Sequence, residues 1–242
     1  RANGVPYLGI IWCCYNIRHI WSISVMAGIK VTTEPTAEPL SLQEVKEYLR
    51  VDDATDERVV QPLIIAARQF AEEHMNRALM QQTFTLTIDT ALDTENPLWE
   101  GMRTAPDINY YKNYVVLPKS PVISVTSVKT YNDSDTATTM SASKYYVDTQ
   151  REPARIVLRT GETFPTALRV ANAIEVVYVA GYTTAYAIPE PIRLGMLQHI
   201  AYMYEHRGDM YEAQGAPTLM KNLYAPYVIH GGLGSSSLMS LG

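Results

Sequence analysis

The sequence predicts an α+β fold, in which helices from both ends of the chain form one bundle and a mostly antiparallel β block is inserted between them. Residues 41–76 carry apolar side chains at helical spacing, and residues 80–181 alternate as strands do. Residues 190–225 then return to helix. The sequence contains no catalytic motif that interrupts this order. The pattern therefore favours a structural building block over an enzyme.

The composition narrows the possible functions. Twenty-five Asp and Glu outnumber twenty Lys and Arg among 242 residues. An acidic chain is a poor candidate for a protein that binds nucleic acid through the phosphates, although DNA could move past it without being bound. Tyr is abundant, with 17 copies against 3 Phe and 3 Trp. Because Tyr combines an apolar ring with a polar tip, it suits surfaces that are exposed in one state and buried in another.

The first 25 residues differ from the rest of the chain. The chain begins with Arg1, its first methionine is Met26, and residues 1–25 contain no acidic residue but both cysteines, Cys13 and Cys14. Two adjacent cysteines do not make a zinc site or a disulfide framework. We interpret residues 1–25 as a non-native or disordered extension, the alternative being an arm that orders only against a partner.

Residues 26–40 are predicted to be an extended lead-in, because Pro35 and Pro39 each disfavour helix at the preceding residue. Ser41 and Glu44 then have the spacing of a capping box at the start of a helix. The main domain is expected to span residues 41–230.

A second helix is predicted from about Asp56 to about Met75, with a kink or a later start at Pro62. Asn76 is a candidate left-handed terminator of this helix. Arg68 and Glu72 lie one turn apart, and we expect them on its polar side. His74 falls on the apolar stripe and is interpreted as a core histidine.

The β block contains several predicted strands separated by turns. The clearest, residues 83–89, alternates threonine with apolar residues, and residues 174–180 are apolar on both faces and are expected to be central. Further strands are predicted at 115–117, 122–131, 145–148 and 155–158. Residues 93–113 are interpreted as a long exposed loop.

In the last long helix, residues 192–204 are apolar around most of the circumference. Only a narrow polar stripe interrupts it, formed by Gln198, His199, Glu205 and His206. Such a helix must be buried on more than one side, either by its own chain or by neighbouring subunits. Residues 231–242 are rich in Gly and Ser and are predicted to be a flexible tail.

No catalytic, cofactor-binding or metal site is predicted. The sequence has neither a nucleophile elbow nor a phosphate-binding loop. The candidates for a metal site are His199, Glu205 and His206, but a seven-residue spacing separates the two histidines by ~10 Å, too far for one ion. The acidic residues near Asp52 are typical of a helix N-terminus.

The order and spacing of short fragments resemble the head–tail connector, or adaptor, proteins of tailed phages and phage-like particles. The matching fragments lie at 41–52, 63–68, 76–79, 117–122, 125–128, 146–148, 151–156, 179–182, 188–193 and 223–227. Tyr146-Val147-Asp148 with the following Arg151-Glu152-Pro153-Ala154-Arg155-Ile156 is especially similar.

The resemblance implies a non-enzymatic subunit of a ring, dodecameric in the family, that sits beneath the portal protein in the neck of the virion. It also implies a downstream neck or tail protein as a partner and DNA that passes through the channel without specific binding. It implies neither a cofactor nor a membrane. The candidate contacts to the portal or to the next neck protein are Tyr224, Pro226, Tyr227, Val228 and Ile229, which precede the flexible tail.

Two other functions remain open. The chain could be another neck protein, such as a stopper or a tail-completion protein, and direct binding to the portal would separate these roles. It could also be a soluble hydrolase or a ligand-binding module that uses residues 93–114 as a lid, which a deep polar pocket with converging titratable groups would favour.

Overall fold

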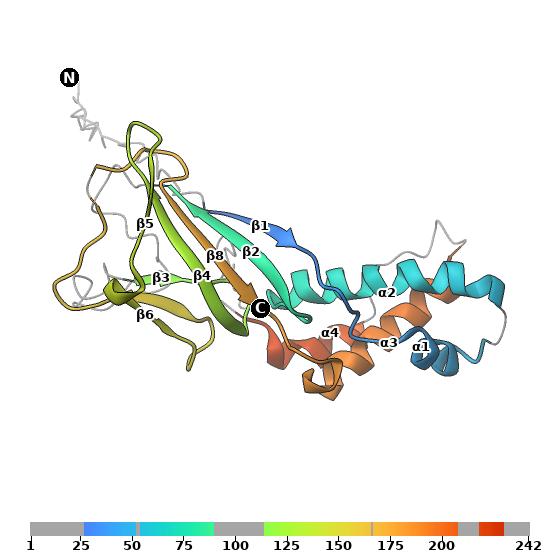
Figure 1. Cartoon of the computed structure of the whole chain (residues 1–242). Helices are drawn as coiled ribbons and strands as arrows, with labels where there is room; N and C mark the ends of the chain where they lie inside the picture. Colours follow the sequence, from blue (N-terminus) through green and yellow to red (C-terminus); the bar gives the residue numbers. More distant parts are fainter. Residues whose placement is uncertain (1–26, 52–53, 90–113, 166, 208–217, 230–242) are drawn as a thin grey trace, which may run out of the picture.

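The computed structural model describes residues 27–51, 54–89, 114–165, 167–207 and 218–229, and every structural statement below concerns these residues. They form two parts, a β part and a helical layer, that lie side by side (Figure 1). The fold is α+β with antiparallel sheets, as the sequence predicts.

The larger sheet has five strands in the order β1-β2-β8-β4-β5. These strands are β1 (Ala27–Thr33), β2 (Gln82–Ile88), β8 (Ile174–Ala180), β4 (Val122–Tyr131) and β5 (Ala137–Thr139). Strand β8 is in the middle, as its apolar sequence predicts. Its faces are unequal, however, because alternate residues such as Glu175 are only half-buried.

A smaller sheet of three strands packs against the larger one. Its order is β3 (Tyr114–Val116), β7 (Arg155–Leu158) and β6 (Tyr145–Asp148). Apolar side chains from both sheets share one core, in which Leu86, Leu117 and Tyr178 are fully buried. The Tyr178 hydroxyl donates a hydrogen bond to the Pro118 carbonyl oxygen at 2.6 Å, and burial raises the pKa of this phenol.

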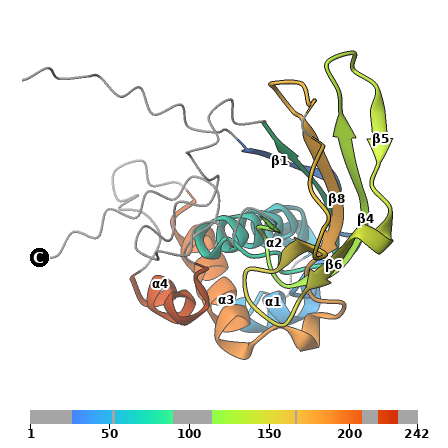
Figure 2. The same ribbon diagram turned by 90° about the vertical axis from the view of Figure 1, so that its left-hand side faces the viewer.

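Four helices form the helical layer around a second core. They are α1 (Leu42–Leu49), α2 (Ala54–Met75), α3 (Glu190–Glu205) and α4 (Thr218–Tyr224), and short 3-10 turns lie at Ala142–Lys144, Ala185–Ala187 and Ala225–Tyr227. The four helices all contribute to one apolar cluster, so segments from both ends of the chain meet there (Figure 2).

Local sequence signals place the ends of the first two helices. The Ser41 hydroxyl accepts from the Glu44 amide at 3.2 Å, which confirms half of the predicted capping box. The Glu44 carboxylate does not turn back; it accepts from Arg193 of α3 at 2.7 Å. Asn76 ends α2 with a φ of 53°, as predicted for a left-handed terminator.

Two expectations about strands and helix starts need correction. Helix α2 begins at Ala54 and continues through Pro62, so the later start is wrong. Pro62 is exposed on the outer side of α2, where water can reach the backbone carbonyl that lacks its usual partner. Within the lead-in, residues 27–33 form strand β1 and pair with β2. Residues 93–113, interpreted as a loop, lie outside the described residues.

The predicted environments of Arg68, Glu72 and His74 on α2 are also wrong. Arg68 and Glu72 do form an ion pair at 3.1 Å, but both are buried, with 5% and 9% exposure, rather than on a polar face. His74 is exposed instead of buried in the core, and its ring lies beside those of Phe70 and Tyr224. Helical spacing alone does not show which side a tertiary partner covers.

Candidate assembly surfaces

The five residues predicted to contact a partner have different environments. Tyr224 is fully buried in the helical core, and Ile229 is 9% exposed. Tyr227 and Val228 are half-buried, and Pro226 is exposed. Tyr224 is therefore a core residue of this chain, because its ring fills space between α3 and α4. Partner contact stays a prediction for Pro226, which is exposed, and for Tyr227 and Val228, which pack partly against the helical core.

Gly195 of α3 explains why Tyr224 is buried. A Cβ atom at Gly195 would lie 2.5 Å from Cε1 of Tyr224, so only glycine lets the ring lie against the α3 backbone. The Tyr224 hydroxyl is buried, it has no hydrogen-bond partner in the described part of the chain, and burial raises its pKa. A glycine inside an otherwise apolar helix was the available signal for this close approach.

The segment after Tyr224 is tied to the junction between the helical layer and the β part. The Ile229 amide donates to the Met75 carbonyl oxygen at 3.0 Å. Arg77, which is 8% exposed, donates from Nε to the Tyr227 carbonyl oxygen at 2.6 Å, and both of its terminal nitrogens contact the Glu152 carboxylate. One buried guanidinium thus joins the end of α2, the β6–β7 turn and the C-terminal segment.

A buried ionic network lies beside this junction. Glu72 accepts from Arg68, from the Leu79 amide at 2.8 Å and from the Gln82 side chain at 2.8 Å. Burial is the largest influence on this carboxyl and raises its pKa, despite these donors. Glu38 supplies a second carboxylate to Arg68 at 2.8 Å. The network joins the lead-in, α2 and the start of β2.

Backbone contacts complete the junction. The Ala78 amide donates to the Ser120 carbonyl oxygen at 3.0 Å, and the Gly181 amide donates to that of Pro121 at 2.8 Å. Gly181 has a φ of 114°, and an added Cβ would lie 2.1 Å from the Met80 carbonyl oxygen, so no other residue fits. The Ala78–Ser120 bond links the end of α2 to the segment before β4, and Gly181 lets the end of β8 lie against the Met80 backbone.

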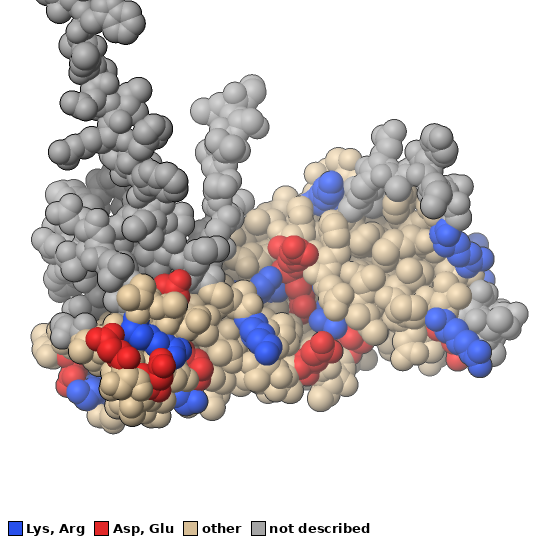
Figure 3. Space-filling view, turned by 90° about the horizontal axis from the view of Figure 1, so that it is seen from above, with Lys and Arg blue, Asp and Glu red and all other residues tan. Residues whose placement is uncertain are grey.

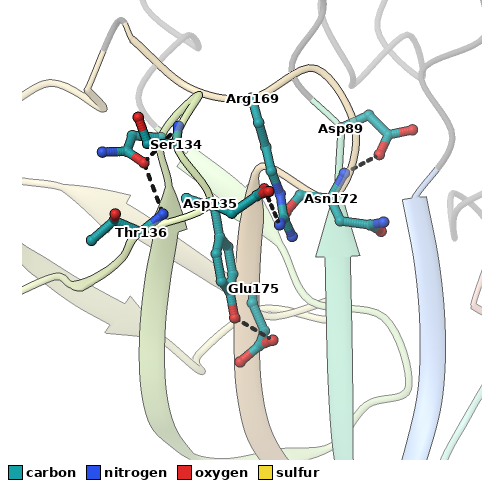
Figure 4. A network of polar contacts seen from close by, with 9 residues as sticks. Asp89, Ser134, Asp135, Thr136, Arg169, Asn172 and Glu175 are labelled. Atoms are coloured by element: carbon teal, nitrogen blue, oxygen red, sulfur yellow. Dashed lines mark hydrogen bonds and ion pairs between the residues drawn. The ribbon is translucent and has the colours of Figure 1, made fainter.

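At the opposite end of the larger sheet, a cluster of polar contacts fixes the β4–β5 turn against the loop before β8 (Figure 4). Arg169 lies over the Tyr131 ring at 4.0 Å, pairs with Asp135 at 3.1 Å and donates to the Asn172 carbonyl oxygen. The Asn172 amide donates to Asp89 at 2.6 Å. This tip cluster is an ordered surface far from the helical layer.

The metal candidates of the sequence do not converge. His199 is 7% exposed on the inner side of α3, so it is not part of a polar stripe, and burial lowers its pKa. His206 at the end of α3 lies 2.8 Å through Nδ1 from the Tyr202 carbonyl oxygen. In the described part of the chain, no group of three or more His, Cys, Asp or Glu is placed to hold an ion.

A depression along α1 offers little support for a hydrolase. It has a volume of about 760 Å³, is open to solvent and is lined by Leu42, Gln43, Lys46, Glu47, Arg50, Val51 and Glu57. Two of its charged residues, Lys46 and Glu57, are paired with each other at 2.8 Å. None of the helices in the described ranges has the length and apolarity needed to cross a membrane.

The comparisons with known proteins give structural neighbours only. No protein-family model matches the chain, and the comparison with curated proteins gives no significant match. A chain from the neck of an empty gene transfer agent (GTA) particle, computed with C6 symmetry, has a TM-score of 0.63 and 20% identity, covering 85% of this chain and 99% of that one.

Two further structures agree. A chain from the virion of a native GTA particle has a TM-score of 0.63 and 16% identity, covering 85% of this chain and 97% of that one. A chain from the neck of a native GTA particle, computed with C12 symmetry, has a TM-score of 0.58 and 20% identity, with coverages of 85% and 99%. The protein therefore has the fold of chains found in the necks of GTA particles, in agreement with its resemblance to head–tail connector proteins.

Proposed function

We propose that this protein is a structural subunit of the neck of a tailed phage or phage-like particle, where it acts as a head–tail connector. The supporting observation is the fold, which matches nearly the whole length of chains from GTA necks and most of this chain. Those necks were computed with C6 and C12 symmetry, which supports a ring. The ring is proposed to contain twelve copies.

The proposed partners are further copies of the chain, the portal protein above the ring and a neck or tail protein below it. DNA passes through the central channel without specific binding. A formal net charge of −5 suits such a channel, because a surface without excess positive charge does not hold phosphates. The proposed location is the neck of the virion, which is assembled in the bacterial cytoplasm. The proposed role is structural rather than enzymatic.

A rigid subunit suits this role. The Arg77 contacts and the backbone bond from Ala78 to Ser120 hold the helical layer and the β part together. Each end of the elongated subunit can then meet a different partner, the helical layer at one end and the tip cluster at the other (Figure 1). Residues Pro226, Tyr227 and Val228, together with the chain that follows them, remain the proposed contact to the portal.

The portal contact can be tested without disturbing the core. Removing residues 223–242 would delete Tyr224, so the informative truncation ends after Ile229, and Pro226→Glu is a matching point variant. Both proteins should fold, and both should lose co-sedimentation with a purified portal complex. Thr138→Glu, on the exposed strand β5, is the control and should bind normally. Normal binding by both the truncated protein and Pro226→Glu would refute this contact.

The same fold also fits another neck position, such as a stopper or a tail-completion protein. The discriminating observation is direct binding to the portal. Particles made without the protein provide the test of the broader role: filled heads and separate tails are expected. Joined particles in the absence of the protein would contradict a connecting function of any kind.

A further inference from the structure

Two helices of the helical layer present uncharged surfaces to solvent. Between Arg58 and Glu73, the exposed residues of α2 carry no charge, and we call them the α2 outer face: Val59, Gln61, Pro62, Ile65, Ala66 and Gln69. On α3, one side of the helix carries exposed and half-buried residues that are outside the apolar core cluster, and we call them the α3 outer face: Pro191, Leu194, Gln198 and Ala201.

Helix α2 reverses the usual distribution of charge on a surface helix. In a helix whose outer side faces solvent, charged and polar residues occupy the exposed side and apolar residues occupy the buried side. In α2 the charged residues Arg68 and Glu72 are buried, whereas Ile65 is 38% exposed. The outer side of α2 between Arg58 and Glu73 therefore has no charged side chain, although the same stretch of helix contains two buried ones.

Helix α3 shows the same reversal. Arg193 is 9% exposed and pairs with Glu44 at 2.7 Å and with Glu190 at 2.9 Å, whereas Leu194 next to it is 42% exposed. His199 is also turned inward. Two helices with the same reversal, in one layer, indicate surfaces that are buried in an assembly.

The two outer faces point away from each other. Helices α2 and α3 bury their inner sides in the same core, and α2 lies along one side of the helical layer in Figure 1 with α3 and α4 along the other. Figure 3 looks onto the layer from the α2 side and shows uncharged surface over it, with charged side chains gathered at its margins. A subunit of a closed ring needs two different contact faces on opposite sides.

We propose that the α2 outer face of one copy packs against the α3 outer face of the next copy. This inference rests on the proposed ring. The second copy is the fitting occupant because the faces match each other in chemistry: each combines a proline, an alanine and at least one branched aliphatic side chain with at least one glutamine. Neither face contains a charged side chain, so the contact would not desolvate an unpaired charge.

The size of the contact predicts how the ring assembles. The α2 outer face runs from Val59 to Gln69, ~16 Å at ~1.5 Å per residue, and a strip ~10 Å wide along it covers ~160 Å². Stable interfaces bury ~800 Å² on each partner. The helical contact alone is therefore weak between two copies, and rings should form cooperatively at high concentration or on the portal as a template.

Sedimentation velocity of the full chain at rising concentration, with and without purified portal complex, tests the proposal. Ala66→Glu and Ala201→Glu each place one charge in one outer face, and Thr138→Glu adds the same charge on exposed strand β5 as the control. Each outer-face variant should need at least ~10-fold more protein to form rings, the shift that ~1.4 kcal/mol per contact produces. The control should assemble like the wild type.

A cross-linking experiment tests which faces meet. Ala66→Cys and Ala201→Cys are made in separate chains of different mass, with Cys13 and Cys14 replaced by serine, and then mixed and treated with a bismaleimide. Products that join Ala66→Cys to Ala201→Cys should exceed products that join two identical variants. A Thr138→Cys chain should give little product with either.

Each outcome is decisive. If the wild type forms rings and both outer-face variants assemble like the control, the function stands and this interface is wrong. If identical variants cross-link preferentially, the contact is not between α2 and α3. If the wild type forms no ring even with portal, the proposed function fails and this inference fails with it. Thermal melts should show that both glutamate variants are folded, because their sites are not in the core.

Discussion

Replacing Gly195 by alanine should separate α3 from α4, because a Cβ atom there would lie 2.5 Å from Cε1 and 3.0 Å from Cζ of Tyr224. The ring of Tyr224 is fully buried and cannot swing into solvent. The contact pins the C-terminal segment to the helical layer. The alanine variant therefore tests whether Tyr224 is a core residue.

Two opposing effects set the magnitude. Alanine favours helix over glycine by ~1 kcal/mol. Overpacking a filled core costs ~1–3 kcal/mol, and a contact this short against a rigid buried ring belongs at the upper end. The free energy of unfolding should therefore fall by ~2 kcal/mol. For a chain of 242 residues this corresponds to a fall in Tm of ~4–8 °C.

Urea unfolding followed by circular dichroism provides the measurement, and a second background identifies the cause. Tyr224→Ala alone should cost ~3–5 kcal/mol, as for other large buried rings. In that background the added methyl group has no ring to meet, so Gly195→Ala should become stabilising by up to ~1 kcal/mol. An equal loss of stability in both backgrounds would show that Tyr224 is not the obstacle.

Three further predictions concern the junction, α3 and the tip cluster. Arg77→Met should lower the free energy of unfolding by ~2 kcal/mol in the same urea assay, because it leaves the half-buried Tyr227 carbonyl and Glu152 without their donor, and wild-type stability would contradict the role of this junction. Burial lowers the pKa of His199, so neutral histidine stabilises the fold above pH 6.5 and this contribution is lost as the pH falls through the lowered value. Unfolding at pH 7 and at about pH 5 should therefore show a smaller acid-induced loss for His199→Gln than for the wild type, and equal losses would refute this. Arg169→Ala should cost ~1 kcal/mol and speed hydrogen exchange of the Asn172 amide without affecting that of α2, and unchanged exchange at Asn172 would show that the tip cluster is not held by Arg169.

The regular elements of this chain follow from short-range pattern. Strand β2 alternates as its threonines and apolar residues predict, because one face lies on the core and the other on solvent. Ser41 and Asn76 mark helix ends through bonds and backbone angles that depend on neighbouring residues alone. Strand β5, Ala137–Thr139, was missed because three exposed residues carry no alternation.

The sequence was less informative where an element meets a distant one. The spacing of Arg68 and Glu72 is the same for a solvated pair and a buried pair, and only the packing of Glu38, Leu79 and Gln82 around them decides between the two. Tyr224 looked like a surface tyrosine near a tail.

Its burial depends on Gly195, 29 positions earlier in the sequence, and spacing along one helix cannot show such a contact. The candidate interface on α2 was also missed. It becomes visible only when Arg68 and Glu72 are known to point inward.

The most direct test of the central claim is the mass of the full chain in solution, measured by light scattering alone and after mixing with purified portal complex. A connector should give either a ring close to twelve times the 27.1 kDa mass of one chain or a stable complex that elutes with the portal. A species of 27.1 kDa that persists at high concentration and does not bind the portal would contradict the account.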